Sequence, residues 1–292
     1  LLVKKESDLA IYMLILSGIS LVGQALIWGY LKRYLEPVSI KKINIKQHFK
    51  GIMVLFVPTI AVSIYRAFDK TMIGIFTNSS SENGYYEQAD RIVQMCITVP
   101  TALSTVMAPR IASNMAKKNI DMVNEYMCKT YEALLLIAMP LGIGIFCTSN
   151  MIVPWFLGEQ YYKVITLLKI FSIIIPIIAL SNASGAQYLI QAREEKVYTK
   201  SVFLGAIVNF GLNLLMIPRM ASVGAAIASV IAEFSILFYQ ILYICKKNRT
   251  LKLKQLFNNL RICIISCMCM TLIVMLIKTF FQPNFLGTIC VA

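Results

Sequence analysis

Long apolar runs alternate with short polar connections along almost the whole sequence. Each run is close to or above the roughly 20 residues that a helix needs to cross a bilayer. The composition agrees, because 58% of the 292 residues are hydrophobic and only 14% are charged. The pattern predicts an all-α polytopic membrane protein with spans at Leu9–Leu31, Gly51–Phe76, Tyr86–Pro109, Tyr126–Thr148, Val164–Ile190, Ser201–Pro218, Val223–Cys245 and Ile262–Thr279, and a ninth that begins near Phe285.

Basic residues gather on alternate connections between these runs. Of the 28 Lys and Arg residues, 19 lie on one set of connections and five on the other. The positive-inside rule assigns the rich set to the cytoplasm, so residues 78–83 are expected outside and residues 246–254 inside. Topology and anionic membrane lipids then explain the net charge of +14, and no nucleic-acid partner is expected.

The run Gly51–Phe76 is unusual because it carries Arg66, Asp69 and Lys70 in its second half. A charge near the bilayer centre costs roughly 2.5–3.5 kcal/mol on insertion scales, so these three should not face lipid. Their spacing places them on one side of a helix. One interpretation is a polar stripe that faces a wet cavity. The other is a lock of Asp69 with Arg66 or Lys70 between packed helices, but two bases and one acid would still leave a positive charge.

Two later apolar runs carry further polar residues that are candidates for the functional site. In Tyr86–Pro109, Arg91 and Gln94 belong to a polar face with helical spacing, and Arg91 either lines the cavity or extends to the membrane interface. In Val223–Cys245, Glu233 is a single carboxylate. It could be protonated, paired with a base or hydrogen-bonded structurally, and a coupling-ion role is the functional alternative.

The cysteines give no sign of a disulfide framework or a metal site. All eight lie within or beside apolar runs, and the only histidine is His48. We expect no metal, no cofactor and no catalytic residue. The basic segment Val38–Lys50 is expected to be an interfacial helix, with a plain loop as the alternative. Both ends look cut, which indicates a fragment of a longer membrane protein.

Three stretches resemble the Wzx-type polysaccharide transport flippases of the MOP superfamily, which are relatives of the MATE exporters and the lipid II flippase. They are SIYRAFDKTMIG with Tyr65, Asp69, Lys70 and Gly74, then Gly84–Arg110 with Arg91, and Asn209–Phe234 with Glu233. The resemblance implies a MOP-superfamily helical bundle, here about nine transmembrane helices. Residues 1–36 would be the last helix of the first lobe, 37–50 a basic interfacial linker, 51–245 the six-helix second lobe, and 246–292 extra C-terminal helices, truncated.

The same resemblance implies a function. It is a transporter, not an enzyme, that moves undecaprenyl-pyrophosphate-linked oligosaccharide across the bacterial plasma membrane for capsule, O-antigen or exopolysaccharide synthesis. Membrane lipids and the polysaccharide polymerase and export proteins would be its partners. The expected cavity residues are Tyr65, Arg66, Asp69, Lys70, Arg91 and Gln94. In this hypothesis Arg66 binds the substrate phosphate, and Asp69 orients a basic neighbour.

Three alternatives make different predictions. A MATE-like cation-coupled exporter of small molecules should have surplus acid in its cavity, whereas these spans have surplus base. A membrane polymerase of the same pathway should have a large exported loop with catalytic residues, and the outer connections are short. A non-transporting scaffold should have locked charge pairs and no open cavity.

Overall fold

The computed structural model describes residues 9–31, 45–247 and 253–280, and every regular element in these ranges is helical. The chain forms two compact units, residues 1–50 and residues 51–292. In the first unit, α1 (Leu9–Leu31) has the bounds that the sequence predicted. The helix α2 (Ile45–Thr77) begins in the first unit and continues into the second. The end of the segment expected as an interfacial linker is therefore the first turn of α2, and residues 38–44 lie outside the described residues.

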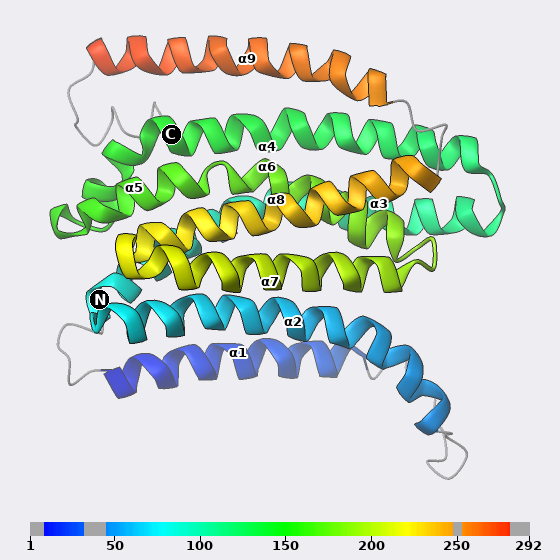
Figure 1. The fold of residues 1–292 in the computed structure, drawn as a ribbon, viewed down its shortest axis with the longest axis horizontal. Coiled ribbons are helices and arrows are strands. Elements are labelled where there is room, and N and C mark those ends of the chain that lie inside the picture. Colours follow the sequence, from blue (N-terminus) through cyan, green and yellow to red (C-terminus); the bar gives the residue numbers. More distant parts are fainter. Residues whose placement is uncertain (1–8, 32–44, 248–252, 281–292) are drawn as a thin grey trace. The chain divides into compact units, whose positions relative to one another are not determined.

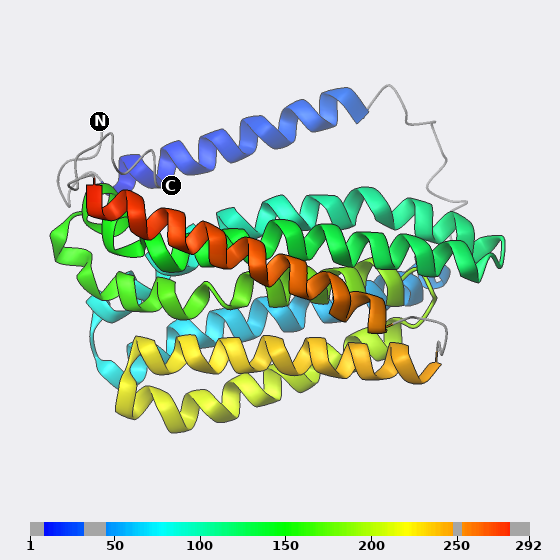
Figure 2. The same ribbon diagram turned by 90° about the horizontal axis from the view of Figure 1, so that it is seen from above.

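The rest of the second unit is a bundle of long helices that run in similar or opposite directions (Figure 1). Its helices α7 and α8 lie side by side, as do α4 and α9 (Figure 2). The elements after α2 are α3 (Ser80–Ala116), α4 (Ile120–Phe156), a short 3₁₀ turn (Glu159–Tyr161), α5 (Tyr162–Phe171), α6 (Ile174–Asn182), the π-helix η4 (Ala183–Leu189), α7 (Glu195–Met220), α8 (Ser222–Lys247) and α9 (Leu253–Phe280).

The start of α3 corrects one expectation. Residues 78–83 were expected to be a polar connection between two spans, but the helix already begins at Ser80. Ser79 is the N-cap, and its hydroxyl accepts a hydrogen bond from the backbone N–H of Glu82 at 3.4 Å. Ser followed three residues later by Glu is a known signal for a helix start, so the cap explains the early beginning.

A second correction concerns the expected span Val164–Ile190. The structure bends it by 46° between α5 and α6, and it continues as a π-helix. Pro176 has no N–H for the carbonyl of Ser172, so the regular hydrogen-bond ladder cannot pass this point. Gly142 of α4 packs against the break, where an added Cβ would lie 2.6 Å from the Ser172 carbonyl oxygen. The break is therefore part of the packing between α4 and this span.

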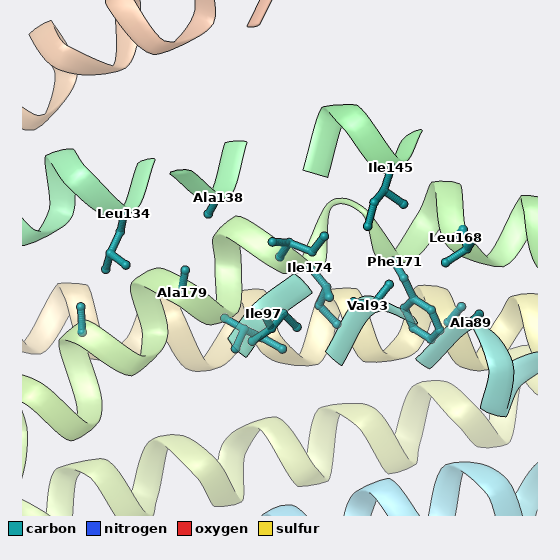
Figure 3. Close-up of a cluster of buried hydrophobic side chains, with 14 of the residues drawn as sticks. Ala89, Val93, Ile97, Leu134, Ala138, Ile145, Leu168, Phe171, Ile174 and Ala179 are labelled. Carbon is teal, nitrogen blue, oxygen red and sulfur yellow. The ribbon is translucent and has the colours of Figure 1, made fainter. Parts of the chain in front are cut away.

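The core of the second unit fills the space between α3, α4, α5 and α6 (Figure 3). Small and branched side chains alternate there, and the ring of Phe171 packs edge-on against Tyr86 with centroids 5.3 Å apart. The labelled residues are Ala89, Val93, Ile97, Leu134, Ala138, Ile145, Leu168, Phe171, Ile174 and Ala179. This packing holds α3 in register with the broken span.

Five helices in the described part of the chain are long and apolar enough to cross a membrane, or six if the bent pair counts as one span. They lie in α1, α3, α4, α7 and α8, and the pair is α5 with α6 and η4. The protein is thus an all-helical, multi-pass membrane protein. The sequence predicted about nine spans, which is more than these five or six. That α2 crosses the membrane stays a prediction. The expected ninth span lies outside the described residues.

Candidate functional site

The polar residues of α2 separate into different surroundings, although they share one half of the helix. Asp69 is buried with 2% of its surface exposed, whereas the side chain of Lys70 is 37% exposed. Arg66 is half-buried and faces a small cavity. The structure forms neither the Asp69–Arg66 nor the Asp69–Lys70 lock among its described residues.

Asp69 is held by neutral donors from three other helices. Its Oδ2 accepts from the Tyr86 hydroxyl of α3 at 2.9 Å and from the Ser229 hydroxyl of α8 at 3.0 Å. Its Oδ1 accepts from the Asn213 amide of α7 at 2.5 Å. Asn213 also donates to Asn209 Oδ1 at 3.1 Å. The hypothesis that Asp69 orients a basic neighbour is therefore wrong for this structure, because the groups bonded to it carry no charge.

Glu233 lies one turn further along α8 than Ser229 and forms a second buried polar contact. The Tyr65 hydroxyl of α2 donates to its Oε1 at 2.6 Å. Arg66, the next residue on α2, lines the same cavity as Glu233 and Asp90, and its positive charge is attracted to both carboxylates. Of the three possibilities for Glu233, the structure shows the hydrogen bond directly, and the attraction to a base accompanies it.

The carboxylates of Asp69 and Glu233 line the same cavity, which has a volume of about 30 Å³. A space of this size has room for water molecules but not for a sugar. Among the predicted residues, the cavity brings together Tyr65, Arg66, Asp69, Gln94 and Glu233. The remaining wall residues are Tyr86, Asp90, Val93, Phe171, Ile174, Ile178 and Ser229.

Lys70 and Arg91 lie outside this wall and share one carboxylate. Both form ion pairs with Glu87 of α3, and the distance from Arg91 Nε to Glu87 Oε1 is 2.9 Å. Next to them, Gln94 donates to Asp90 at 3.2 Å. The predicted bases Lys70 and Arg91 therefore lie close together. Glu87, which binds both of them, was not predicted as a site residue.

These contacts change the expected charge balance. Three bases (Arg66, Lys70 and Arg91) are grouped with four carboxyl groups (Asp69, Glu87, Asp90 and Glu233). The expected surplus of base is absent from this neighbourhood. Any anion that binds here must therefore compete with the carboxylates of the protein.

The surroundings of Asp69 are rich in oxygen atoms of the kind that bind a proton or a hard cation. Asn213 Oδ1 is buried and has no hydrogen-bond partner among the described residues. No group of three or more His, Cys, Asp or Glu side chains with metal-binding geometry occurs in the described part of the chain. A cation at Asp69 would need the amide and hydroxyl oxygens of Asn209, Asn213 and Ser229 as well.

The sequence carried an incomplete signal for the residues around Asp69 that were not predicted as site residues. Asn209 and Asn213 are four residues apart, and Ser229 lies four residues before the predicted Glu233, so each pair lies on one helix face. This spacing does not show which helix each pair will meet.

The fold and site define a multi-pass helical membrane protein with charged groups enclosed among its helices. The chain belongs to the polysaccharide biosynthesis protein family, which matches residues 8–166, more than half of the chain. This confirms the resemblance that the three sequence stretches predicted.

Two curated relatives are flippases. The chain is 23% identical over 239 residues to the probable low-salt glycan biosynthesis flippase Agl15 of Haloferax volcanii, covering 76% of this chain and 48% of the relative. It is 21% identical over 167 residues to the lipid II flippase MurJ of Bacillus subtilis, covering 53% and 29%. The chain thus spans about half or less of the length of these relatives.

A solved structure has the same fold. The lipid II flippase MurJ in an inward closed conformation superimposes with a TM-score of 0.69 at 17% identity, covering 84% of this chain and 52% of that one. At this identity the match supports the helical architecture alone.

Proposed function

We propose that the protein to which this chain belongs is a flippase for a lipid-linked oligosaccharide, and that the cavity beside α2 receives part of the headgroup. The observation that carries the proposal is Arg66. It is a half-buried base on the wall of a small cavity, and it has no ion pair among the described residues. The family and the two flippase relatives support the same function.

The substrate class follows from the chemistry of the problem. Phosphate and sugar groups cannot cross hydrocarbon unaided, because they would lose water without replacement. An Arg can bind phosphate through two parallel hydrogen bonds, and Gln94 and Tyr65 can bind hydroxyl groups. We propose undecaprenyl-pyrophosphate-linked repeat units as the substrate, the bacterial plasma membrane as the location, and capsule, O-antigen or exopolysaccharide synthesis as the pathway.

The small size of the cavity requires a conformational cycle. A space of about 30 Å³ cannot hold a sugar, so the surrounding helices have to separate before the headgroup enters. We propose residues 51–245 as the second of two lobes, residues 1–36 as the end of the first lobe, and 37–50 as the linker between them. Movement of one lobe against the other would expose the site to each side in turn.

A second function is favoured by one observation. The four carboxyl groups near the cavity match what a MATE-like exporter of small cations needs. The two functions differ in the sign of the substrate charge, which makes them separable.

The test uses the full-length protein reconstituted into vesicles with a fluorescent diphosphate-linked oligosaccharide lipid. Transfer between leaflets is measured by quenching from outside, and uptake of a cationic dye is measured in parallel. We expect lipid transfer and no dye uptake, and we expect Arg66→Gln to lower the transfer at least about tenfold. Dye uptake without lipid transfer would replace the flippase with the exporter.

A further inference from the structure

Glu87 forms ion pairs with two bases and has no role in the function proposed above. Its carboxylate binds Lys70 of α2 and Arg91 of its own helix at the same time. Bases that could bind a headgroup are therefore already occupied by a carboxylate of the protein. Glu87 contributes one negative charge to two positive ones.

The position of this cluster connects it to the cavity. Lys70 lies one helical turn beyond Arg66, which lines the cavity, and Glu87 lies one turn before Asp90, which also lines it. A headgroup with a phosphate at Arg66 and a second charged group one turn away would reach Lys70. The ion pairs thus lie next to the proposed headgroup site.

The exposure of the cluster permits exchange of partners. The side chains of Lys70, Glu87 and Arg91 are 37%, 31% and 52% exposed. Ion pairs at this exposure contribute little, because solvent screens them and long side chains lose entropy. Asp69 differs, since it is buried and its three donors come from three helices. Glu87 can leave its bases at low cost, and Asp69 cannot.

We propose that Glu87 is an exchangeable internal counter-ion that sets the least charge a headgroup must carry. The inference rests on the proposed function, because it assumes an anionic headgroup. A singly charged group gains nothing over Glu87, because it only replaces one carboxylate charge with another. A diphosphate diester carries two negative charges and neutralises both bases, so it displaces Glu87 with a net gain. The site therefore binds diphosphate-linked sugars more tightly than monophosphate-linked ones.

The test measures binding of two short-chain polyprenyl lipids to the purified full-length protein in detergent. One lipid carries a sugar through a diphosphate and the other carries the same sugar through a monophosphate. In the parent we expect the monophosphate to bind about tenfold more weakly, the size of one charge-assisted hydrogen bond. Glu87→Gln should raise monophosphate affinity to the level at which the parent binds the diphosphate.

Two further variants distinguish the release of Lys70 and Arg91 by Glu87 from the general effect of removing one negative charge. In the Lys70→Gln/Arg91→Gln background, Glu87→Gln should no longer change monophosphate affinity, because no shared base is left to release. Glu125→Gln removes the carboxylate of a comparable exposed pair with Lys129 at 2.6 Å and should leave both affinities unchanged.

Several results would overturn the inference. These are equal affinities in the parent, an unchanged monophosphate affinity in Glu87→Gln, or a gain that survives loss of both bases. If Glu87→Gln fails to fold, Glu87→Asp replaces it, because the shorter side chain keeps its charge but cannot hold both bases. The Glu87→Asp protein should bind the monophosphate lipid more tightly than the parent does. An unchanged affinity counts against the proposal. Leaflet transfer by the parent is measured separately. Its absence defeats the proposed function, whereas transfer without charge selection defeats only the role of Glu87.

Discussion

Arg66 and Asp69 are three residues apart on one helix, yet their partners have little in common. Asp69 is bound by Tyr86, Asn213 and Ser229, whereas Arg66 faces the cavity and the charges of Glu233 and Asp90. Substitutions at the two positions should therefore act independently.

Arg66→Lys is expected to keep part of the flipping activity, because the charge remains and the bidentate geometry is lost. Arg66→Gln should lower flipping at least about tenfold, the size of one charge-assisted hydrogen bond, with normal membrane abundance. Since no ion pair joins the two residues among the described contacts, Arg66→Gln/Asp69→Asn should not recover activity. Polymer output and membrane abundance are measured together. Recovery in the double variant would establish the lock instead of the phosphate site.

Each of the two buried carboxylates should be replaceable by its amide without loss of folding. In Glu233→Gln, the remaining carbonyl oxygen can still accept from the Tyr65 hydroxyl, so folding should be retained. In Asp69→Asn the hydroxyls of Tyr86 and Ser229 can rotate to accept, so its melting temperature should also stay near that of the parent. Asp69→Ala leaves three donors without an acceptor and should cost about 1–3 kcal/mol for each one that stays unsatisfied. Transport of each variant is then measured against pH and sodium; an unchanged profile at full activity would make that carboxylate purely structural.

At the scale of single helices, the contact between α7 and α8 depends on Gly224. An added Cβ there would lie 2.5 Å from the backbone carbonyl oxygen of Met216, which cannot move away without shifting α7. Gly224→Ala is expected to destabilise the protein by about 1–3 kcal/mol, the usual cost of overpacking. Thermal unfolding in detergent checks this. Gly211→Ala on α7 is the control, since no atom lies within 4 Å of its added Cβ, and it should be neutral or stabilising by up to about 1 kcal/mol.

The turn between η4 and α7 is joined to the end of α8 through Glu194. Its carboxylate accepts from the Lys247 ammonium and, at 3.0 Å, from the Tyr243 hydroxyl. The hydrogen bond from Lys247 holds the pKa of Glu194 below its ordinary value. The folded state then binds this proton less readily than the unfolded state, so the contribution is present at neutral pH and is lost as pH falls through the lowered pKa. Between pH 7 and pH 3 the melting temperature of the parent should fall more than that of Glu194→Gln; parallel curves would contradict the contact.

Helices were predictable to different degrees. The apolar run and its polar boundaries predicted α1 to the residue, and they predicted α7 and α8 to within a turn or two. Hydropathy gives no signal for the break at Ser172, because isoleucines continue on both sides of it, and Pro176 is the sequence signal for an interruption there. The residue that packs against the break, Gly142, is distant in sequence, so this contact could not be predicted. The same limit applies to the site: helical spacing grouped Asn209 with Asn213, but only the packing of α7 against α2 shows that they meet Asp69.

At the scale of the whole molecule, the charge asymmetry predicts opposite sides for the two turns that flank α3. In a variant whose eight native cysteines are replaced, a single cysteine at Ser80 should react with an impermeant maleimide in intact cells. One at Lys117 should react only after the membrane is opened. Both positions are exposed in the structure, so lack of access would reflect sidedness. The reverse result would invert the orientation of every span.

The distance along the chain between Asp69 and its partners has a consequence for biosynthesis. Asn213 and Ser229 follow Asp69 by 144 and 160 residues. At about 5–20 residues per second, a ribosome needs roughly 7–30 s to make them after Asp69 has left the synthesis site. During that interval only Tyr86, 17 residues on, is close enough in sequence to be available early. The insertion machinery must therefore shelter α2 until α7 and α8 emerge, and nascent chains that stop before α7 are expected to be degraded by membrane quality control.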